Sequence, residues 1–241
     1  YNYQNWFPSA EYETINTRKN VGLFELTPFS KYELKGENCY EDLQRICTAN
    51  IKKEIGKCTY TQMLNIDGGI ETDLTVICLA DNHFRIITAA ANRERDKFHI
   101  KKHISENTKL IDVTDDFCTL GIFGPKSRDL MSDLSKNDFS NSNFKFGIGK
   151  NIQINDINVW VQRLSYVGEL GYELYIDMSK AKEIYNLIVN AGKKYQLSHC
   201  GVHAMDIMRM ESGFLHWGHD ISPEENQLQA GLLFTVSFKK E

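Results

Sequence analysis

A β-hairpin between residues 60 and 79 is the feature that most constrains the fold of this 241-residue chain. The runs 60–64 and 74–79 are rich in strand-forming residues. The link between them reads Asn65-Ile66-Asp67-Gly68-Gly69. Asp-Gly and Gly-Gly are strong turn signals because glycine adopts positive φ without steric cost. Two strands joined so tightly are expected to pair antiparallel.

Short strands and helices are interleaved along the rest of the chain. Alternating or β-branched runs predict strands, and apolar residues at helical spacing predict helices. The predicted strands are 31–35, 84–88, 117–123, 159–164 and 172–176, and the predicted helices are 38–48, 92–105, 127–134, 179–191 and 202–211. For the last strand pair we expect a turn built on glycine and glutamate. The polar stretch 135–143 is the best candidate for a linker. Many strand links are short hairpins, which favours an α+β fold over a doubly wound parallel sheet.

Composition is that of a soluble globular protein, with 41% apolar and 25% charged residues. The net charge is −4 and no long run carries one sign, so a nucleic-acid footprint is not indicated. We find no apolar run long enough to cross a bilayer, and residues 1–13 lack the pattern of a signal peptide. Six scattered cysteines without a C-x-x-C pair are typical of free thiols in a reducing compartment. We therefore expect a cytoplasmic location, or the mitochondrial matrix in a eukaryote.

The segment 165–176, SYVGELGYELYI, combines carboxylates with glycines and aromatic residues. Gly168 and Gly171 bracket Glu169, and Glu173 follows in the strand. A carboxylate in such a place can accept two parallel N–H bonds from a planar, nitrogen-rich ring. The alternative is an ordinary apolar strand with a surface glutamate after a bulge glycine.

Asp73 follows the glycine pair of the hairpin and enters the run LTVICL. If it is partly buried, its pKa would rise and it could relay a proton to a ligand over the turn. Alternatively, it starts a strand and accepts hydrogen bonds from the turn backbone. The chain has no dinucleotide-binding glycine motif, no P-loop and no G-x-S-x-G elbow, so carboxylate chemistry is what remains.

Six of the seven histidines occur in three groups, and none of these groups has the third and fourth partners of a metal site. His99 and His103 are four apart, His216 and His219 flank Trp217, and a third group spans 199–203. Spacing without further ligands is a weak metal signal. We predict no metal site.

Four runs together resemble the glycine-cleavage T-protein superfamily of folate-dependent aminomethyltransferases. They are VGLFELTPF (21–29), MLNIDGGIETDLTV (63–76), SYVGELGYELYI (165–176) and RMESGFLHWGHDI (209–221). Their order and spacing match, and they are spread over most of the chain, from residue 21 to residue 221. The resemblance implies an aminomethyltransferase-like fold of intertwined α/β subdomains, without the C-terminal β-barrel.

The finer resemblance is to the folate domain of dimethylglycine and sarcosine dehydrogenases. It is carried by the run 4–7 (QNWF), by SYVGELGYEL and by Trp217 in W-G-H-D. In those enzymes a flavin domain precedes this region and a small barrel follows it. Residues 1–241 would then be the folate-binding region alone, and FAD would enter only with an upstream domain.

The resemblance implies that tetrahydrofolate is the cofactor and that a one-carbon unit is transferred to it from an N-methyl amine. Glu169 would hold the amino and N–H groups of the pteridine, and Asp73 would orient the nucleophilic folate nitrogen and relay its proton. Met63, Tyr172 and Trp217 would pack against the folate. Arg209 would support Glu211 or reach the acidic tail.

Two departures from the family pattern affect this site. Thr72-Asp73 stands where Asp-Asp is common, and Ala89 stands where an Asn is common.

Two alternative functions stay open. One is another transferase of the superfamily, a true T-protein or a sulfonium demethylase. The other is a non-catalytic folate-binding module of the iron–sulfur assembly type, whose K-G-C-Y-x-G-Q segment the run 56–62 resembles only superficially.

Overall fold

The computed structural model describes residues 4–240. Residues 1–3, at the start of the segment examined for a signal peptide, and residue 241 lie outside the described residues. The chain divides into two compact units, and each is assembled from two stretches of sequence. Unit 1 consists of residues 1–27 and 115–214, and unit 2 consists of 28–114 and 215–241. The chain therefore passes from one unit to the other three times, as the predicted intertwined fold requires.

Helices and strands are interleaved throughout, which confirms the α+β class. The α-helices are α1 (Phe7–Lys19), α2 (Cys39–Ile46), α3 (Arg93–His103), α4 (Ser127–Leu134), α5 (Ala181–Gly192) and α6 (Val202–Glu211). The strands are β1 (Gly22–Glu25), β2 (Ser30–Lys35), β3 (Cys58–Leu64), β4 (Ile70–Ala80), β5 (His83–Thr88), β6 (Lys109–Asp112), β7 (Phe117–Phe123), β8 (Gly149–Ile154), β9 (Ile157–Gln162), β10 (Gly171–Asp177) and β11 (Ser198–Cys200).

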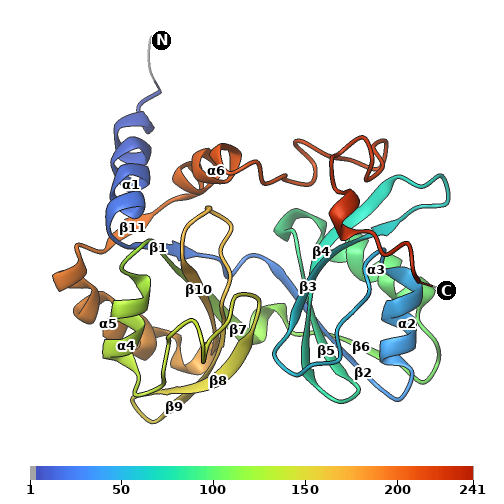
Figure 1. Ribbon diagram of the computed structural model, residues 1–241, viewed down its shortest axis with the longest axis horizontal. Coiled ribbons are helices and arrows are strands. Elements are labelled where there is room, and N and C mark those ends of the chain that lie inside the picture. Colours follow the sequence, from blue (N-terminus) through green and yellow to red (C-terminus); the bar gives the residue numbers. More distant parts are fainter. Residues whose placement is uncertain (1–3, 241) are drawn as a thin grey trace. The chain divides into compact units, whose positions relative to one another are not determined.

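Unit 1 is built on a six-stranded sheet in the order β11-β1-β7-β10-β9-β8. Its neighbours pair antiparallel except β1 and β11, which are parallel. Helices α4 and α5 pack on one face (Figure 1) and bury apolar side chains against it. In β10 Tyr172, Leu174 and Ile176 belong to this core. Since side chains alternate along a strand, Glu173 and Tyr175 point to the opposite face.

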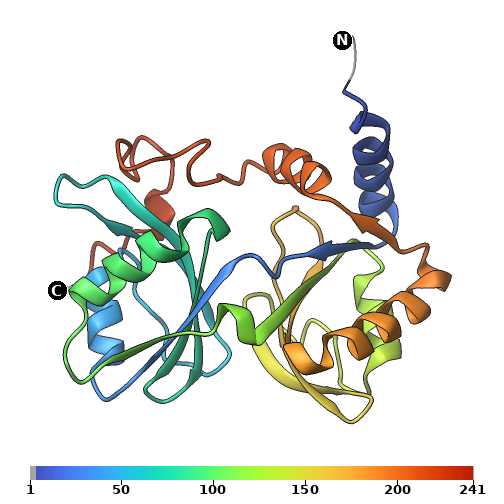
Figure 2. The same ribbon diagram turned by 180° about the vertical axis from the view of Figure 1, so that it is seen from behind.

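Unit 2 is built on a five-stranded antiparallel sheet in the order β3-β4-β5-β2-β6. Helices α2 and α3 cover one face (Figure 2) and contribute Leu43 and Ile100 to its core. The alternation in β4 places Leu74 and Val76 in this core. Asp73 therefore lies on the face away from the two helices.

The segment 215–240, drawn in orange-red to red in Figure 1, packs along the β3–β4 hairpin of unit 2. The N–H of Ile70 donates to the carbonyl of Glu225 at 2.8 Å, and the N–H of Ser237 donates to that of Thr48 at 2.9 Å. A Cβ on Gly69 would lie 1.7 Å from the carbonyl oxygen of Pro223. The second glycine of the hairpin turn is therefore required by this close approach.

Two details differ from the sequence predictions. The polar stretch 135–143 is not a linker, because it lies inside unit 1 and buries Phe139 against Tyr172 in an edge-on contact of 5.5 Å between ring centroids. The helix predicted from residue 179 also starts later than expected. Ser179 lies inside a short 3₁₀ turn, where its N–H donates to the Asp177 carboxylate at 2.9 Å, and α5 starts two residues later.

Candidate functional site

Asp73 is a half-buried carboxyl group in β4, and side chains of the neighbouring strand form hydrogen bonds with it. Gln62 stands directly opposite in β3, and its amide nitrogen donates to Asp73 Oδ1 at 2.9 Å. The side chain of Tyr60, also in β3, makes a second hydrogen bond. Burial raises the pKa of Asp73 to about 6, assisted by repulsion from Asp96 and opposed by the two hydrogen bonds. The sequence argument that burial would raise this pKa is confirmed.

A pKa near 6 makes the stability of unit 2 depend on pH. The unfolded chain releases the Asp73 proton near its ordinary value of 3.8, and the folded chain releases it near 6. Between these values the folded state binds more protons, so the contribution of Asp73 falls as pH rises through about 6. We compare the free energy of unfolding of Asp73→Asn with that of the wild type. The difference should shift in favour of the variant by on the order of 1–2 kcal/mol when the pH is raised from about 4.5 to about 7.5. Urea unfolding at both pH values measures this, and a constant difference would contradict it.

Glu169 lies in the loop before β10, where Arg18 of α1 engages its carboxylate. Arg18 Nη1 donates to Glu169 Oε1 at 3.0 Å and to the carbonyl of Val167 at 2.7 Å. Its Nη2 donates to Glu211 Oε2 at 2.7 Å and to the carbonyl of Met208 at 3.3 Å. One guanidinium thus ties the Glu169 loop to the end of α6. No sequence motif pointed to Arg18, because it is 151 residues from Glu169 in the chain.

Replacing Arg18 tests how firmly this guanidinium holds the loop. Arg18→Gln removes both ion pairs and leaves the half-buried Glu169 and the exposed Glu211 without their cation. We expect a loss of about 1–2 kcal/mol in the free energy of unfolding, since the groups are partly exposed to screening water. The adjacent exposed cation offers a matched control, Lys19→Gln. Equal urea midpoints for the two variants would show that the guanidinium bonds contribute no stability.

The two glycines around Glu169 are explained by neighbours within unit 1. Gly168 has φ of +70°, and a Cβ on it would lie 2.0 Å from the Ser212 hydroxyl. A Cβ on Gly171 would lie 2.5 Å from the ring of Phe123. The backbone is close to other parts of the protein at both positions. The glycines alone therefore give no evidence for a flat ligand.

Two of the predicted folate contacts are core residues. Met63 is fully buried in the core of unit 2, and Tyr172 is fully buried in the core of unit 1 between Phe139 and Phe144. The Tyr172 hydroxyl is buried and has no hydrogen-bond partner among residues 4–240. Both side chains pack in the cores of their units. Contact of either one with folate stays a prediction.

Trp217 and Arg209 are both engaged by their own unit. The indole nitrogen of Trp217 donates to the carbonyl of Ile70 at 2.9 Å, and Arg95 lies 4.3 Å above its ring. The ring also packs against the apolar cluster of Ile70, Ile221 and Leu232. Arg209 is buried and pairs with Asp206 at 2.7 Å. Glu211 pairs with Arg18, and a role of Arg209 in supporting Glu211 or in reaching the acidic tail of folate stays a prediction.

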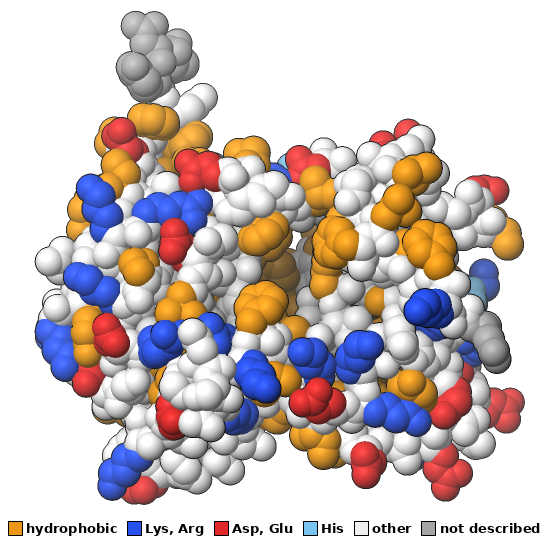
Figure 3. Space-filling view, viewed as in Figure 1, with side chains coloured by type: hydrophobic (Ala, Val, Ile, Leu, Met, Phe, Trp, Pro, Cys, Tyr) orange, Lys and Arg blue, Asp and Glu red, His pale blue; other side chains and the backbone are white. Residues whose placement is uncertain are grey.

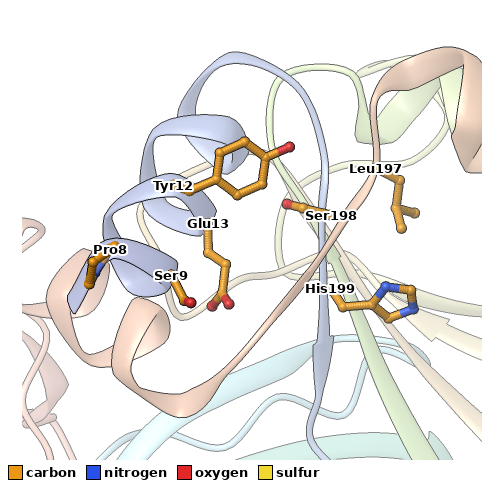
Figure 4. A pocket seen from close by; sticks show the side chains of 7 residues that line it. All are labelled: Pro8, Ser9, Tyr12, Glu13, Leu197, Ser198 and His199. Atoms are coloured by element: carbon orange, nitrogen blue, oxygen red, sulfur yellow. The ribbon is translucent and has the colours of Figure 1, made fainter. Parts of the chain in front are cut away.

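An open pocket of about 510 Å³ lies between α1 and β11 of unit 1 (Figure 4). Tyr12, Glu13 and His199 are among its lining residues, and none of the predicted site residues is. The Glu13 carboxylate accepts the N–H of Gly201 at 2.7 Å, at the start of α6. The Glu13 carboxylate of this pocket is thus already bonded to the backbone at the start of α6.

Other features of the described chain bear on the functional class. The six cysteines are free thiols, as predicted. No helix between residues 4 and 240 combines the length and apolar character that a membrane span needs. Over the same residues, no three His, Cys, Asp or Glu side chains gather as metal ligands would. Basic and acidic side chains are interspersed on the face shown in Figure 3.

A family model described as the GCVT N-terminal domain matches residues 1–240. The chain belongs to this family. A solved structure, that of glycine cleavage system aminomethyltransferase T from Bartonella henselae, superimposes with a TM-score of 0.84 at 23% identity. It covers 95% of this chain and 61% of that one. The superposition confirms the predicted fold.

Curated relatives of this GCVT N-terminal domain are enzymes of two kinds. The 4-methylaminobutanoate oxidase (formaldehyde-forming) of Paenarthrobacter nicotinovorans is 36% identical over all of this chain and 29% of its own length. The mitochondrial dimethylglycine dehydrogenase of Rattus norvegicus is 31% identical over 98% of this chain and 28% of its own. An aminomethyltransferase of Halothermothrix orenii is 31% identical over 99% of this chain and 68% of its own length.

The chain is thus a T-protein superfamily domain of the aminomethyltransferase type, related to both the T-protein and the dimethylglycine dehydrogenases. It spans less than a third of the length of the oxidase and dehydrogenase relatives.

Proposed function

We propose that this domain binds reduced folate and that the protein containing it transfers a one-carbon unit from an N-methyl amine to folate. The observation that carries the proposal is Asp73, a half-buried carboxyl group with a pKa of about 6 in a domain of the GCVT family. A group that titrates near neutral pH can both accept and return a proton during turnover. The alternative role of Asp73, as a strand-starting residue that only binds turn backbone, has less support because its recorded partners are side chains.

Glu169 is the group that we assign to the pteridine. Arg18 bonds its Oε1, which leaves Oε2 and the remaining lone pairs for the amino and N–H groups of the ring. Charged acceptors form stronger hydrogen bonds than neutral ones, so Glu169 suits a ligand with two parallel donors.

Asp73 is the group that we assign to the nucleophilic nitrogen of folate. Reduced folate, when bound, supplies the amine that accepts the one-carbon unit. An iminium produced by amine oxidation is strongly electrophilic, so the protein has mainly to orient that amine and limit water. The Asp73 carboxylate would accept the N–H of the amine and take its proton as the new bond forms.

The amine donor is proposed from the relatives. The 36% identity to a 4-methylaminobutanoate oxidase and the 31% identity to a dimethylglycine dehydrogenase favour an N-methyl amine. Oxidation of that amine would require FAD on a part of the protein outside these 241 residues. The 31% identity to an aminomethyltransferase over 68% of its length supports a second candidate, glycine-cleavage transfer from an aminomethyl-lipoyl carrier.

Calorimetric titration of the protein with tetrahydrofolate tests the shared part of the proposal. A donor assay then separates the candidates by supplying dimethylglycine, 4-methylaminobutanoate, an aminomethyl-lipoyl carrier or a sulfonium compound, each with tetrahydrofolate. We expect folate binding and methylene-folate from an N-methyl amine. Binding without transfer from any donor would indicate a non-catalytic folate module, and no binding would refute the proposal.

A further inference from the structure

We propose that Gln62 and Thr235 form a reversible hydrogen-bond chain that positions Asp73 in both of its protonation states. The inference deepens the proposed function, because Asp73 is the group assigned there to the folate nitrogen. Gln62 is fully buried in β3, and Thr235 is buried in the short 3₁₀ helix 233–235 of the C-terminal segment. The side-chain amide of Gln62 is therefore bonded to Thr235 on one side and to Asp73 on the other.

The structure shows one arrangement of this chain. The Thr235 hydroxyl donates to Gln62 Oε1, and the Gln62 amide nitrogen donates to Asp73 Oδ1 at 2.9 Å. Each group then points a donor toward the next acceptor, and the chain ends on the carboxylate. This arrangement satisfies Asp73 when it is ionised, because an ionised carboxylate only accepts hydrogen bonds.

A second acceptor makes the reverse arrangement available. The carbonyl oxygen of Leu232 lies 2.7 Å from the Thr235 hydroxyl, which has a single proton to give. If that proton turns to Leu232, the Thr235 oxygen becomes an acceptor. Rotation of the Gln62 amide by half a turn then directs its NH₂ to Thr235 and its oxygen to Asp73. Protonated Asp73 can donate to that oxygen, so the principal partners along the chain exchange roles.

The surroundings of Asp73 allow both states to be populated. The groups that act on its titration are Gln62 and Tyr60 of β3 and Asp96 of α3, and no cation is among them. Burial and Asp96 favour the neutral carboxyl group, whereas the two hydrogen bonds favour the ionised one. The opposition of these effects is consistent with a pKa of about 6. Without reversal, protonated Asp73 would face the NH₂ group of Gln62. The carboxyl proton of Asp73 could then not be donated to Gln62.

Neutron diffraction from deuterated crystals of the protein tests the reversal directly, because nuclear density distinguishes ND₂ from oxygen. At about pH 8 we expect the amide deuterons of Gln62 on the Asp73 side. At about pH 4.5 we expect them on the Thr235 side, with the Thr235 deuteron toward Leu232. The same amide orientation at both pH values would overturn the proposal.

Two matched variants separate the chain from simple packing. Thr235→Val keeps the shape and removes the hydroxyl, so the amide loses its low-pH acceptor and should keep its NH₂ toward Asp73 at both pH values. Thr235→Ser retains the hydroxyl and should reverse like the wild type. Reversal in the valine variant would contradict the role of Thr235. All of these readouts are made without folate, so a failure of the proposed function would leave them unchanged.

Discussion

Asp73→Asn should suppress folate-dependent capture of the one-carbon unit by on the order of 100-fold or more, the usual size of a general acid–base contribution. Asparagine has nearly the same shape and can keep a hydrogen bond with Gln62, but it cannot take a proton. We expect amine oxidation in the full-length enzyme to remain nearly intact, since it would belong to a separate flavin domain. Free formaldehyde should rise as methylene-tetrahydrofolate falls. Quantifying both products at saturating folate measures this.

The matched control for this substitution is Asp67→Asn. Asp67 lies in the same hairpin turn and is exposed, so it provides the same chemical change away from the buried carboxyl group. The product ratio of the control should equal that of the wild type. An unchanged ratio in Asp73→Asn as well would show that Asp73 is a structural hairpin residue.

Glu169→Gln should weaken binding of tetrahydrofolate by about 1.5–3 kcal/mol, or roughly 10- to 150-fold in Kd. The substitution replaces a charged acceptor with an amide that presents an unwanted NH₂ to the N–H groups of the ring. It also removes the ion pair with Arg18 at 3.0 Å. Calorimetric titration of the variant and the wild type gives the difference.

Glu211→Gln separates the two consequences of this change. It also removes one ion pair from Arg18, at 2.7 Å, but leaves the Arg18–Glu169 contact in place. We expect its folate affinity to stay within about threefold of the wild type. If the two variants bind folate equally well, Glu169 has only a structural role with Arg18.

The sequence alone determined the local structure and the identity of the two carboxylates. The glycine-rich link at 65–69 predicted the β3–β4 hairpin, and alternation predicted the antiparallel pair β9–β10. These elements follow from short-range backbone preferences and from the period of side chains along a strand. The motifs around Asp73 and Glu169 also predicted the family. By contrast, β1, β6 and β11 have only three or four residues to carry a pattern, and β8 is mostly polar, so these four strands were not predicted.

Only the tertiary structure decided what surrounds each carboxylate. Arg18 meets Glu169, and Thr235 meets Gln62, across separations of 151 and 173 residues. No local pattern encodes such a meeting, because it depends on how the chain returns to each unit after passing through the other. Burial of Met63 and Tyr172 in the cores of the two units likewise depends on tertiary packing. Charge and hydrogen-bonding capacity are properties of the residue, whereas pKa and available partners arise from burial and long-range contacts.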